Sequence, residues 1–200
     1  MLLALDVGNS NLVLGLFRGQ ELAASWRLTT NRAQTGDEFR LLLSGIFAAR
    51  GMVSSAVEGI IVASVVPSLD AMLREALRAH FACDPLWVGP GLKTGMPIRY
   101  DNPADVGADR IVNAVAGFAR HGGPLIIVDF GTATTFDVVS AQGEYCGGII
   151  CPGITISAEA LFNRAARLPR VEIRPPERLI GGSTVASMQS GLYYGYLSLV

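Results

Sequence analysis

The chain has 200 residues, half of them hydrophobic, and its 16 basic and 17 acidic residues give a net charge of −1. Such a chain is long enough to bury a sizeable core in one large domain or two small ones. The near-neutral charge excludes a general electrostatic attraction to nucleic acid or to anionic membranes, so a charged ligand must be held by local groups. There is no basic leader and no apolar run of about 18 residues, which predicts a cytoplasmic protein.

Three strands are expected at the start of the chain. Leu2–Leu5 and Leu12–Phe17 are apolar runs joined by the polar connection Gly8–Asn11. A turn at Gly19 then leads into a third strand around Leu22–Leu28. Short apolar runs separated by glycine-bearing turns are typical of antiparallel strands, so the sequence predicts a β-meander here.

Helices and strands alternate after the meander. Apolar residues at helical spacing follow Thr35, and a second amphipathic pattern begins at a proline. The expected elements are a helix through Phe39, Leu42, Leu43 and Ile46, a strand over Gly59–Val66, a helix over Pro67–Ala79 and a strand over Pro85–Val88. This order predicts an α/β fold.

The loop GPGLKTG, residues 89–95, resembles a phosphate-binding P-loop only superficially. In a P-loop a glycine directly precedes the lysine, whereas Leu92 precedes Lys93 here, and the first glycine is wrongly spaced. We therefore reject a P-loop and expect a lid or edge loop over a substrate pocket.

A further helix is expected from Gly107 onward, with Ile111, Val115 and Phe118 on its apolar face. Asp109 then lies in the first helical turn, where the helix dipole favours its ionised form. The position suits a carboxylate that accepts a proton, although an exposed aspartate is favourable at any helix start.

The opening pattern returns in the stretch LIIVDFGTATTFDVVSAQGEY. A constant offset of 123 residues pairs Asp6 with Asp129, Gly8 with Gly131, Ser10 with Ala133 and Val13 with Phe136. An internal repeat of this kind indicates two similar subdomains. Each hairpin can present backbone N–H groups to a phosphate, and each aspartate can hold a cation or a water molecule, so the pair predicts a phosphate clamp. Either aspartate could instead simply cap its turn.

The segments DVGNSN, DFGTATTFD, DNPADVGADR and GGSTVASMQSG together resemble type III pantothenate kinases, a family of the acetate and sugar kinase, Hsp70 and actin superfamily. The resemblance implies a duplicated ribonuclease H-like (actin-like ATPase) fold with two subdomains around a nucleotide cleft. Residues 1–120 would form the first, with a substrate-binding segment at 89–120, and residues 121–200 the second. The last residues read as the middle of a helix, so we expect the second subdomain to be incomplete at its C-terminus.

The same resemblance implies ATP-dependent phosphorylation of pantothenate, the first step of coenzyme A synthesis. It assigns ATP contacts to Asp6, Val7, Gly8, Asn9, Ser10, Asn11, Leu12, Val13, Gly131 and Thr132. Asp6 would act on Mg²⁺ through water, and Asp129 would bind a monovalent cation, K⁺ or NH₄⁺. The family usually carries threonine at the place of Ser10, which keeps the hydroxyl.

Substrate contacts are implied at Tyr100, Gly107, Ala108, Asp109, Arg110 and Thr184, with Asp109 as the catalytic base. Tyr100 could instead be ordinary core packing, and Arg110 could pair with Asp105. In the functional interpretation, the planar guanidinium of Arg110 binds a carboxylate or phosphoryl group. The family implies a homodimer that completes the substrate pocket.

Two alternatives stay open at this point. A regulatory or accessory protein could keep the clamp without transferring phosphate, although the intact acidic residues weigh against it and the neutral charge offers no surface for DNA. The second alternative is a kinase of the same superfamily that acts on a sugar or on acetate. Only the regions around Gly107–Arg110 and Thr184 separate that kinase from a pantothenate kinase.

Overall fold

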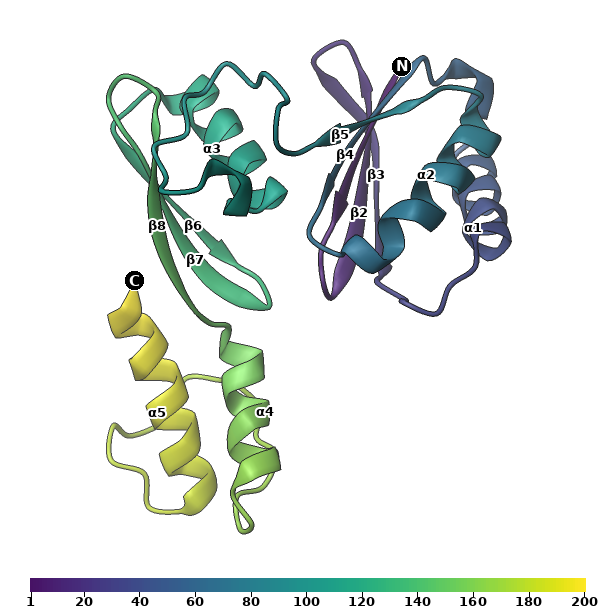
Figure 1. The fold of residues 1–200 in the computed structure, drawn as a ribbon. Coiled ribbons are helices and arrows are strands. Elements are labelled where there is room, and N and C mark those ends of the chain that lie inside the picture. The colour runs from purple at the N-terminus through teal and green to yellow at the C-terminus, as the bar shows by residue number, and fades with distance from the viewer. The chain divides into compact units, whose positions relative to one another are not determined.

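A computed structural model describes residues 1–200 (Figure 1). The chain divides into two compact units. The first unit contains residues 1–125 and 139–147, and the second contains residues 126–138 and 148–200. No helix is long and apolar enough to cross a membrane.

The first unit is built on a five-stranded sheet with the order β3-β2-β1-β4-β5. Its strands are β1 (Leu2–Val7), β2 (Asn11–Arg18), β3 (Glu21–Thr29), β4 (Gly59–Ser64) and β5 (Pro85–Val88). The first three strands form the predicted antiparallel meander, whereas β4 and β5 run parallel to β1. The meander and the alternation that follows it are both confirmed.

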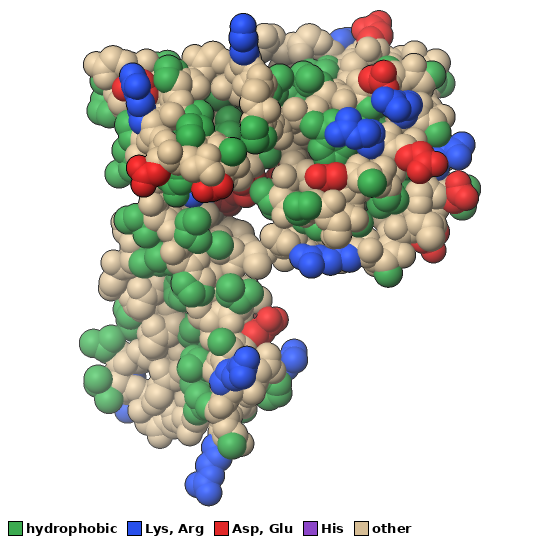
Figure 2. Space-filling view, in the orientation of Figure 1, with side chains coloured by type: hydrophobic (Ala, Val, Ile, Leu, Met, Phe, Trp, Pro, Cys, Tyr) green, Lys and Arg blue, Asp and Glu red, His purple; other side chains and the backbone are tan.

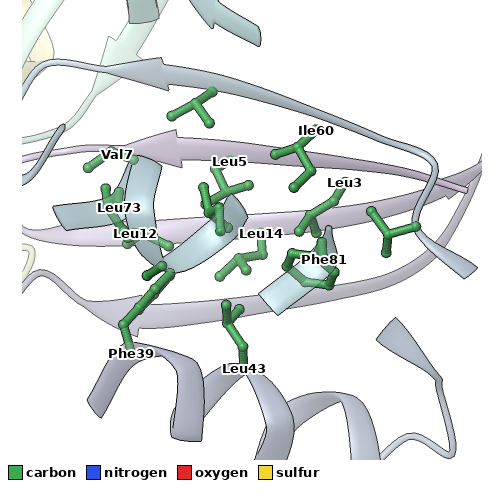
Figure 3. Close-up of a cluster of buried hydrophobic side chains, with 14 of the residues drawn as sticks. Leu3, Leu5, Val7, Leu12, Leu14, Phe39, Leu43, Ile60, Leu73 and Phe81 are labelled. Carbon is green, nitrogen blue, oxygen red and sulfur yellow. The ribbon is translucent and has the colours of Figure 1, made fainter. Parts of the chain in front are cut away.

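Helices α1 (Gly36–Ala48) and α2 (Pro67–Phe81) cover one face of this sheet (Figure 1). The start of α1 is fixed by a capping box in which Thr35 and Glu38 satisfy each other's backbone N–H groups. The start of α2 is fixed by Pro67, whose missing N–H costs nothing in the first turn. Leucines of the strands, such as Leu5 and Leu14, lie in one buried cluster with Phe39 of α1, between the sheet and the two helices (Figure 3).

The opposite face of the sheet receives the start of α3 (Ala108–His121). Side chains alternate along β4, so Val62 enters the core under α1 and α2 while Ala63 points the other way. Ala63 packs there with Ala108 of α3, and Val112 lies against the same cluster. Helix α3 is thereby anchored beside the C-terminal end of β4. Two short 3₁₀ turns, η1 (Ser54–Ala56) and η2 (Pro103–Asp105), lie in the connections.

A second sheet has the order β6-β7-β8 and is followed by two helices. These elements are β6 (Leu125–Phe130), β7 (Ala133–Val139), β8 (Tyr145–Pro152), α4 (Ile154–Arg164) and α5 (Thr184–Leu199). Tyr196 of α5 donates a hydrogen bond to the carbonyl oxygen of Pro152 at 2.6 Å. Its hydroxyl oxygen therefore accepts the 2.6 Å bond from Ser157 of α4, which ties the two helices together.

The predicted constant offset between the two hairpins is wrong beyond the glycines. The N–H of Gly8 bonds the carbonyl of Asn11, whereas the N–H of Gly131 bonds the carbonyl of Ala133, each at 2.9 Å. The second turn is one residue shorter, so Ala133 begins its strand as Asn11 does and does not correspond to Ser10. The aspartate and glycine correspondences are unaffected.

The surface of the chain carries no dominant charge on the face drawn in Figure 2, where acidic and basic side chains are interspersed. Several large apolar side chains of the second unit are exposed. They include Ile126, Phe130, Ile149, Ile150, Leu197 and Val200. The C-terminal helix therefore does not bury all of its apolar residues within this chain.

His80, near the end of α2, should make the stability of the first unit depend on pH. Burial lowers the pKa of His80, and the charge of Arg40 lowers it further. The unfolded chain then binds the proton more readily, so the free energy of unfolding falls as pH drops through the interval below the ordinary histidine pKa. Between about pH 7.5 and about pH 5.5, the protein should lose thermal stability relative to His80→Gln. A difference in Tm that stays constant over this range would contradict the assignment.

Candidate active site

The first hairpin, between β1 and β2, places Asp6 at the end of a buried strand. Leu5 and Val7 point into the core under the helices, so Asp6 between them points to the opposite face and is exposed. A Cβ on Gly8 would come within 3.0 Å of the carbonyl oxygen of Asn11, so this turn is tight enough to favour glycine.

The sheet register brings the Asp6 hairpin and the start of α3 to the same end of the sheet. Asp6 lies opposite Ala63 in the parallel pairing of β1 with β4. Ala63 packs against Ala108, the residue before Asp109. A cavity of about 390 Å³ opens on this face and is lined by Asp6, Ala63 and Val112, among others. The two carboxylates that the sequence singled out in the first unit therefore belong to one region.

The Asp109 carboxylate is held by the first turn of α3. Its Oδ1 accepts a hydrogen bond from the backbone N–H of Arg110 at 2.8 Å. A Cβ built on Gly107 would lie 2.5 Å from the same Oδ1, so only glycine leaves this position of the carboxylate open. The expected helix start and the place of Asp109 in the first turn are confirmed.

Arg110 and Tyr100 are brought together through a residue that sequence reasoning missed. Tyr145 is fully buried, and the Arg110 guanidinium lies 5.8 Å from its ring centroid. The Tyr100 ring is 6.3 Å from the same ring. Tyr100 is exposed and not part of the core, and Asp105 accepts a hydrogen bond from Asn102. Tyr145 gave no sequence signal, because one tyrosine in an apolar strand is ordinary packing.

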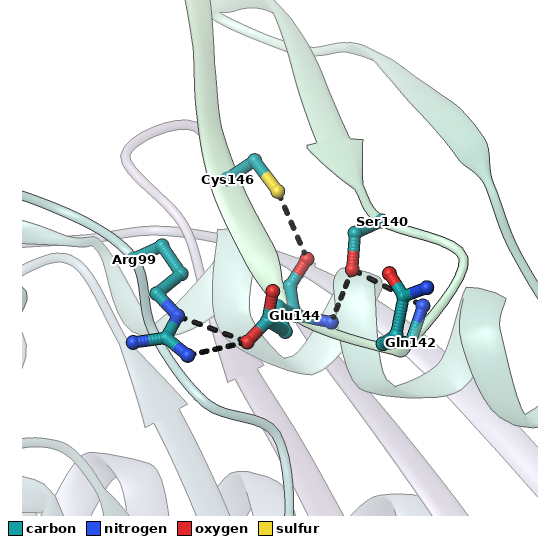
Figure 4. A network of polar contacts seen from close by, with 5 residues as sticks. All are labelled: Arg99, Ser140, Gln142, Glu144 and Cys146. Atoms are coloured by element: carbon teal, nitrogen blue, oxygen red, sulfur yellow. Dashed lines mark hydrogen bonds and ion pairs between the residues drawn. The ribbon is translucent and has the colours of Figure 1, made fainter.

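The tip of β8 fixes the segment before Tyr100 (Figure 4). Arg99 donates from Nε and Nη2 to Oε1 of Glu144, at 2.9 and 2.6 Å. The backbone of Tyr145 exchanges hydrogen bonds with Pro97 and Arg99, at 2.9 and 2.7 Å. Residues 97–99 thus pair with β8 like a short extra strand, which determines where Tyr100 emerges.

The glycine-rich loop at residues 89–95 lines a cavity of about 680 Å³. Its other walls come from Met96–Ile98, from the η2 region and from Ile111 of α3. Gly91 and Gly95 adopt φ values of +90° and +82°, which other residues rarely adopt. The loop therefore has a cavity beneath it, and its action as a lid stays a prediction.

The second hairpin lies in the other unit and is held by the start of α4. Asp129, near the end of β6, is half-buried. The N–H of Gly153 donates to the carbonyl of Thr132 at 2.9 Å. A side chain on Gly153 would collide with the carbonyl oxygens of Gly131 and Thr132. Gly153, which the sequence analysis did not single out, is thus required for this turn to lie against the helix.

Thr184 occupies the first turn of α5 in the second unit. Ser183 caps the helix by accepting a hydrogen bond from the N–H of Ala186 at 3.2 Å, and Thr184 is exposed. A cavity of about 450 Å³ beside this helix start is lined by Arg174, Arg178 and Ser183, among others. Glu177 lines the same cavity, so its carboxylate offsets one of the two arginine charges near the positive end of the helix.

Comparisons with known proteins show the family of the chain. A family model described as type III pantothenate kinase matches residues 2–200. A type III pantothenate kinase from Koribacter versatilis is 57% identical over 210 residues, covering 100% of this chain and 77% of that protein.

Solved structures show the fold. A protein from Campylobacter jejuni described as a Baf family transcriptional activator superposes with a TM-score of 0.57 at 20% identity, covering 98% of this chain and 76% of that chain. A protein from Porphyromonas gingivalis described as an N-acetylglucosamine kinase gives 0.50 at 16% identity, covering 84% and 58%. The fold is the duplicated ribonuclease H-like, actin-like ATPase fold.

Gly107→Ala should disturb the site without unfolding the protein. The new Cβ would push the Asp109 carboxylate from its place, and a displacement of about 1 Å can cost about 100-fold in turnover. Steady-state turnover and Tm measure the two effects separately. Gly45→Ala is the matched control, because Gly45, near the end of α1, has open space around it. Unchanged turnover in Gly107→Ala would show that this contact does not position Asp109.

Proposed function

The chain belongs to the type III pantothenate kinase family and phosphorylates pantothenate with ATP, and we propose that this reaction takes place where the first hairpin meets the start of α3. The observation that carries the proposal is the β1–β4 register, which pairs Asp6 with Ala63. Ala63 in turn packs against Ala108 at the start of α3. Phosphoryl transfer needs positioning and charge neutralisation more than covalent chemistry by the protein. This region supplies carboxylates, a tight backbone turn and a neighbouring cavity.

The ATP phosphates lie along the first hairpin in this proposal. Gly8, Asn9 and Ser10 contact phosphate oxygens with backbone and side-chain donors, and the rest of Asp6–Val13 shapes the turn. Gly131 and Thr132 of the second hairpin provide further ATP contacts. The support is that each turn is closed by a hydrogen bond from a glycine N–H, that of Gly8 in the first hairpin and that of Gly131 in the second.

The residues present fit a Mg²⁺ ion that is held mainly by ATP. No group of three or more His, Cys, Asp or Glu side chains could form a metal site of its own. Mg²⁺ is commonly bound by one or two carboxylates together with phosphates and water, and the exposed Asp6 is such a carboxylate. The bound ion would neutralise charge that develops on the transferring phosphoryl group. Asp6 would hold the ion through its water shell.

Asp109 acts as the base. Its carboxylate accepts the proton of the pantothenate hydroxyl as that oxygen forms a bond to the γ-phosphorus and the bond to ADP breaks. The helix dipole at the start of α3 favours the ionised carboxylate that this step requires. Arg110 grips the substrate carboxylate or the transferring phosphoryl group, and Tyr100, Gly107 and Ala108 complete the acceptor pocket.

The remaining proposals concern the second unit and the assembly. Asp129 binds a monovalent cation, K⁺ or NH₄⁺, and Thr184 contacts pantothenate. A homodimer completes the substrate pocket, and the exposed apolar residues of α5 are available for such a contact. The enzyme acts in the cytoplasm, without nucleic acid or a membrane as partner.

The experiment that tests the function is ADP release from ATP and Mg²⁺, with and without pantothenate, in potassium and then in sodium buffer. We expect release that depends on pantothenate. Release that instead depends on a sugar or on acetate would identify another kinase of the superfamily. A folded chain that binds ATP but releases no ADP would support a regulatory protein.

Asp109→Asn should remove most turnover while it leaves folding and ATP binding intact. The amide keeps the shape of the side chain but cannot accept the proton, so kcat should fall by at least about 100-fold. Turnover assays and calorimetric titration with ATP measure the two properties. If turnover persists undiminished, another residue is the base.

Asp129→Asn should weaken the activation by potassium. The neutral amide holds a cation less well than the carboxylate, so the potassium concentration for half-maximal turnover should rise. A titration of turnover with KCl at constant ionic strength measures this. An unchanged potassium dependence would move the cation site elsewhere in the chain.

A further inference from the structure

The first hairpin is held by residues that follow β3, outside the motif itself. Thr30 Oγ1 donates to the carbonyl oxygen of Gly8 at 2.6 Å. The backbone N–H of Thr30 donates to the carbonyl oxygen of Ser10 at 3.0 Å. Carbonyl oxygens repel phosphate oxygens, and here two carbonyls of the turn already accept donors from Thr30. These two hydrogen bonds therefore reduce the repulsion that an anion would meet at the hairpin.

Arg32 is placed beside the hairpin by a β-turn of its own. The N–H of Gln34 bonds the carbonyl of Asn31 at 3.2 Å, and the N–H of Ala33 bonds the Asn31 side chain at 3.0 Å. Asparagine is favoured at the first position of such a turn because its side chain makes this bond. Arg32 follows Asn31 and donates from Nη2 to Oδ1 of Asn9 at 2.7 Å.

The contact with Arg32 determines how the Asn9 amide is oriented. A guanidinium has donors only, so the Asn9 atom that faces Arg32 must be the carbonyl oxygen. The two N–H donors of the amide are therefore on the nitrogen atom, on the side of the amide away from this contact. Because Asn9 lies at the tip of the hairpin, its amide is oriented to donate to a phosphate oxygen.

The charge of Arg32 is available to a ligand. The hairpin segment Asp6–Val13 contains one acidic residue and no basic residue, although it is the proposed site of a polyphosphate. Arg32 is exposed and forms no ion pair. Only one of its five N–H donors is committed, to Asn9. A planar guanidinium with free donors matches phosphate oxygens in a bidentate way.

We propose that Arg32 is a phosphate-binding residue of the nucleotide site and that Thr30 is the positioning residue that holds the hairpin beside it. The proposal rests on the proposed ATP contacts of the first hairpin. It adds the cation that the hairpin lacks, supplied from a turn about twenty residues farther along the chain.

The test compares Arg32→Gln with Arg18→Gln by calorimetric titration with ATP and with adenosine. Arg18 is an exposed arginine at the opposite end of β2, so its loss changes the net charge equally without touching the hairpin. Arg32→Gln should weaken ATP binding by about tenfold or more, since hydrogen bonds to charged groups are the strong ones. Adenosine binding, the KM for pantothenate and the Tm should stay unchanged. Arg18→Gln should match the wild type.

Two further variants separate ligand contact from a merely structural role. Arg32→Lys keeps the charge but loses the bidentate geometry, so it should recover part of the ATP affinity. Thr30→Val removes only the Oγ1 bond to Gly8 and should also weaken ATP binding, whereas Thr30→Ser should keep it. Equal ATP affinity of wild type and Arg32→Gln would overturn the proposal. So would an Arg32→Gln variant that loses adenosine and ATP affinity equally or loses thermal stability.

The outcomes also distinguish this proposal from the proposed function. A wild-type chain that binds ATP without phosphorylating pantothenate would contradict the activity, while the titrations would still decide the role of Arg32. A wild-type chain that does not bind ATP would contradict both.

Discussion

The parallel pairing of β1 with β4 is the constraint on which the rest of the site depends. It places Asp6 opposite Ala63, and the alternation of side chains turns both residues away from the core under α1 and α2. A slip of one residue would turn Asp6 into that core and Val7 out of it. The buried leucines of β1 and β2 therefore fix the position of the carboxylate as firmly as they fix the fold.

Three functional segments are held by residues from a distant part of the chain. Thr30 bonds the first hairpin, Gly153 packs against the second, and the Glu144–Tyr145 tip of β8 pairs with the segment before Tyr100. Loops that carry function need such support, because their own sequences are polar and have little core to hold them. Glycine is required at Gly153 because a Cβ there would meet the carbonyls of the second hairpin, and at Gly107 because a Cβ there would meet the Asp109 carboxylate.

The sequence predicted most elements of the first unit, whereas α4 was not expected, and the chemical roles of the site residues stay predictions. Apolar runs and their turns predicted the meander and the alternating helices, and Asp109 lies in the first turn of α3 as its apolar spacing indicated. The repeat identified the second hairpin but not its length, because one residue fewer in a turn leaves the motif unchanged.

The supporting residues could not be predicted from the sequence. Thr30, Arg32 and Tyr145 act through contacts across strands or between segments far apart in the chain, and no local pattern marks them. Gly153 is one of 23 glycines, and only the carbonyls that approach it show why it is needed. Such residues become visible only when the register and the packing are known.

The most direct test of the central claim is a crystal structure of the protein with a non-hydrolysable ATP analogue, Mg²⁺ and pantothenate. We expect the triphosphate along Gly8–Ser10 and the pantothenate hydroxyl within hydrogen-bond distance of the Asp109 carboxylate, about 2.6–3.2 Å. A triphosphate bound away from this hairpin, or a hydroxyl that faces a different carboxylate, would contradict the account.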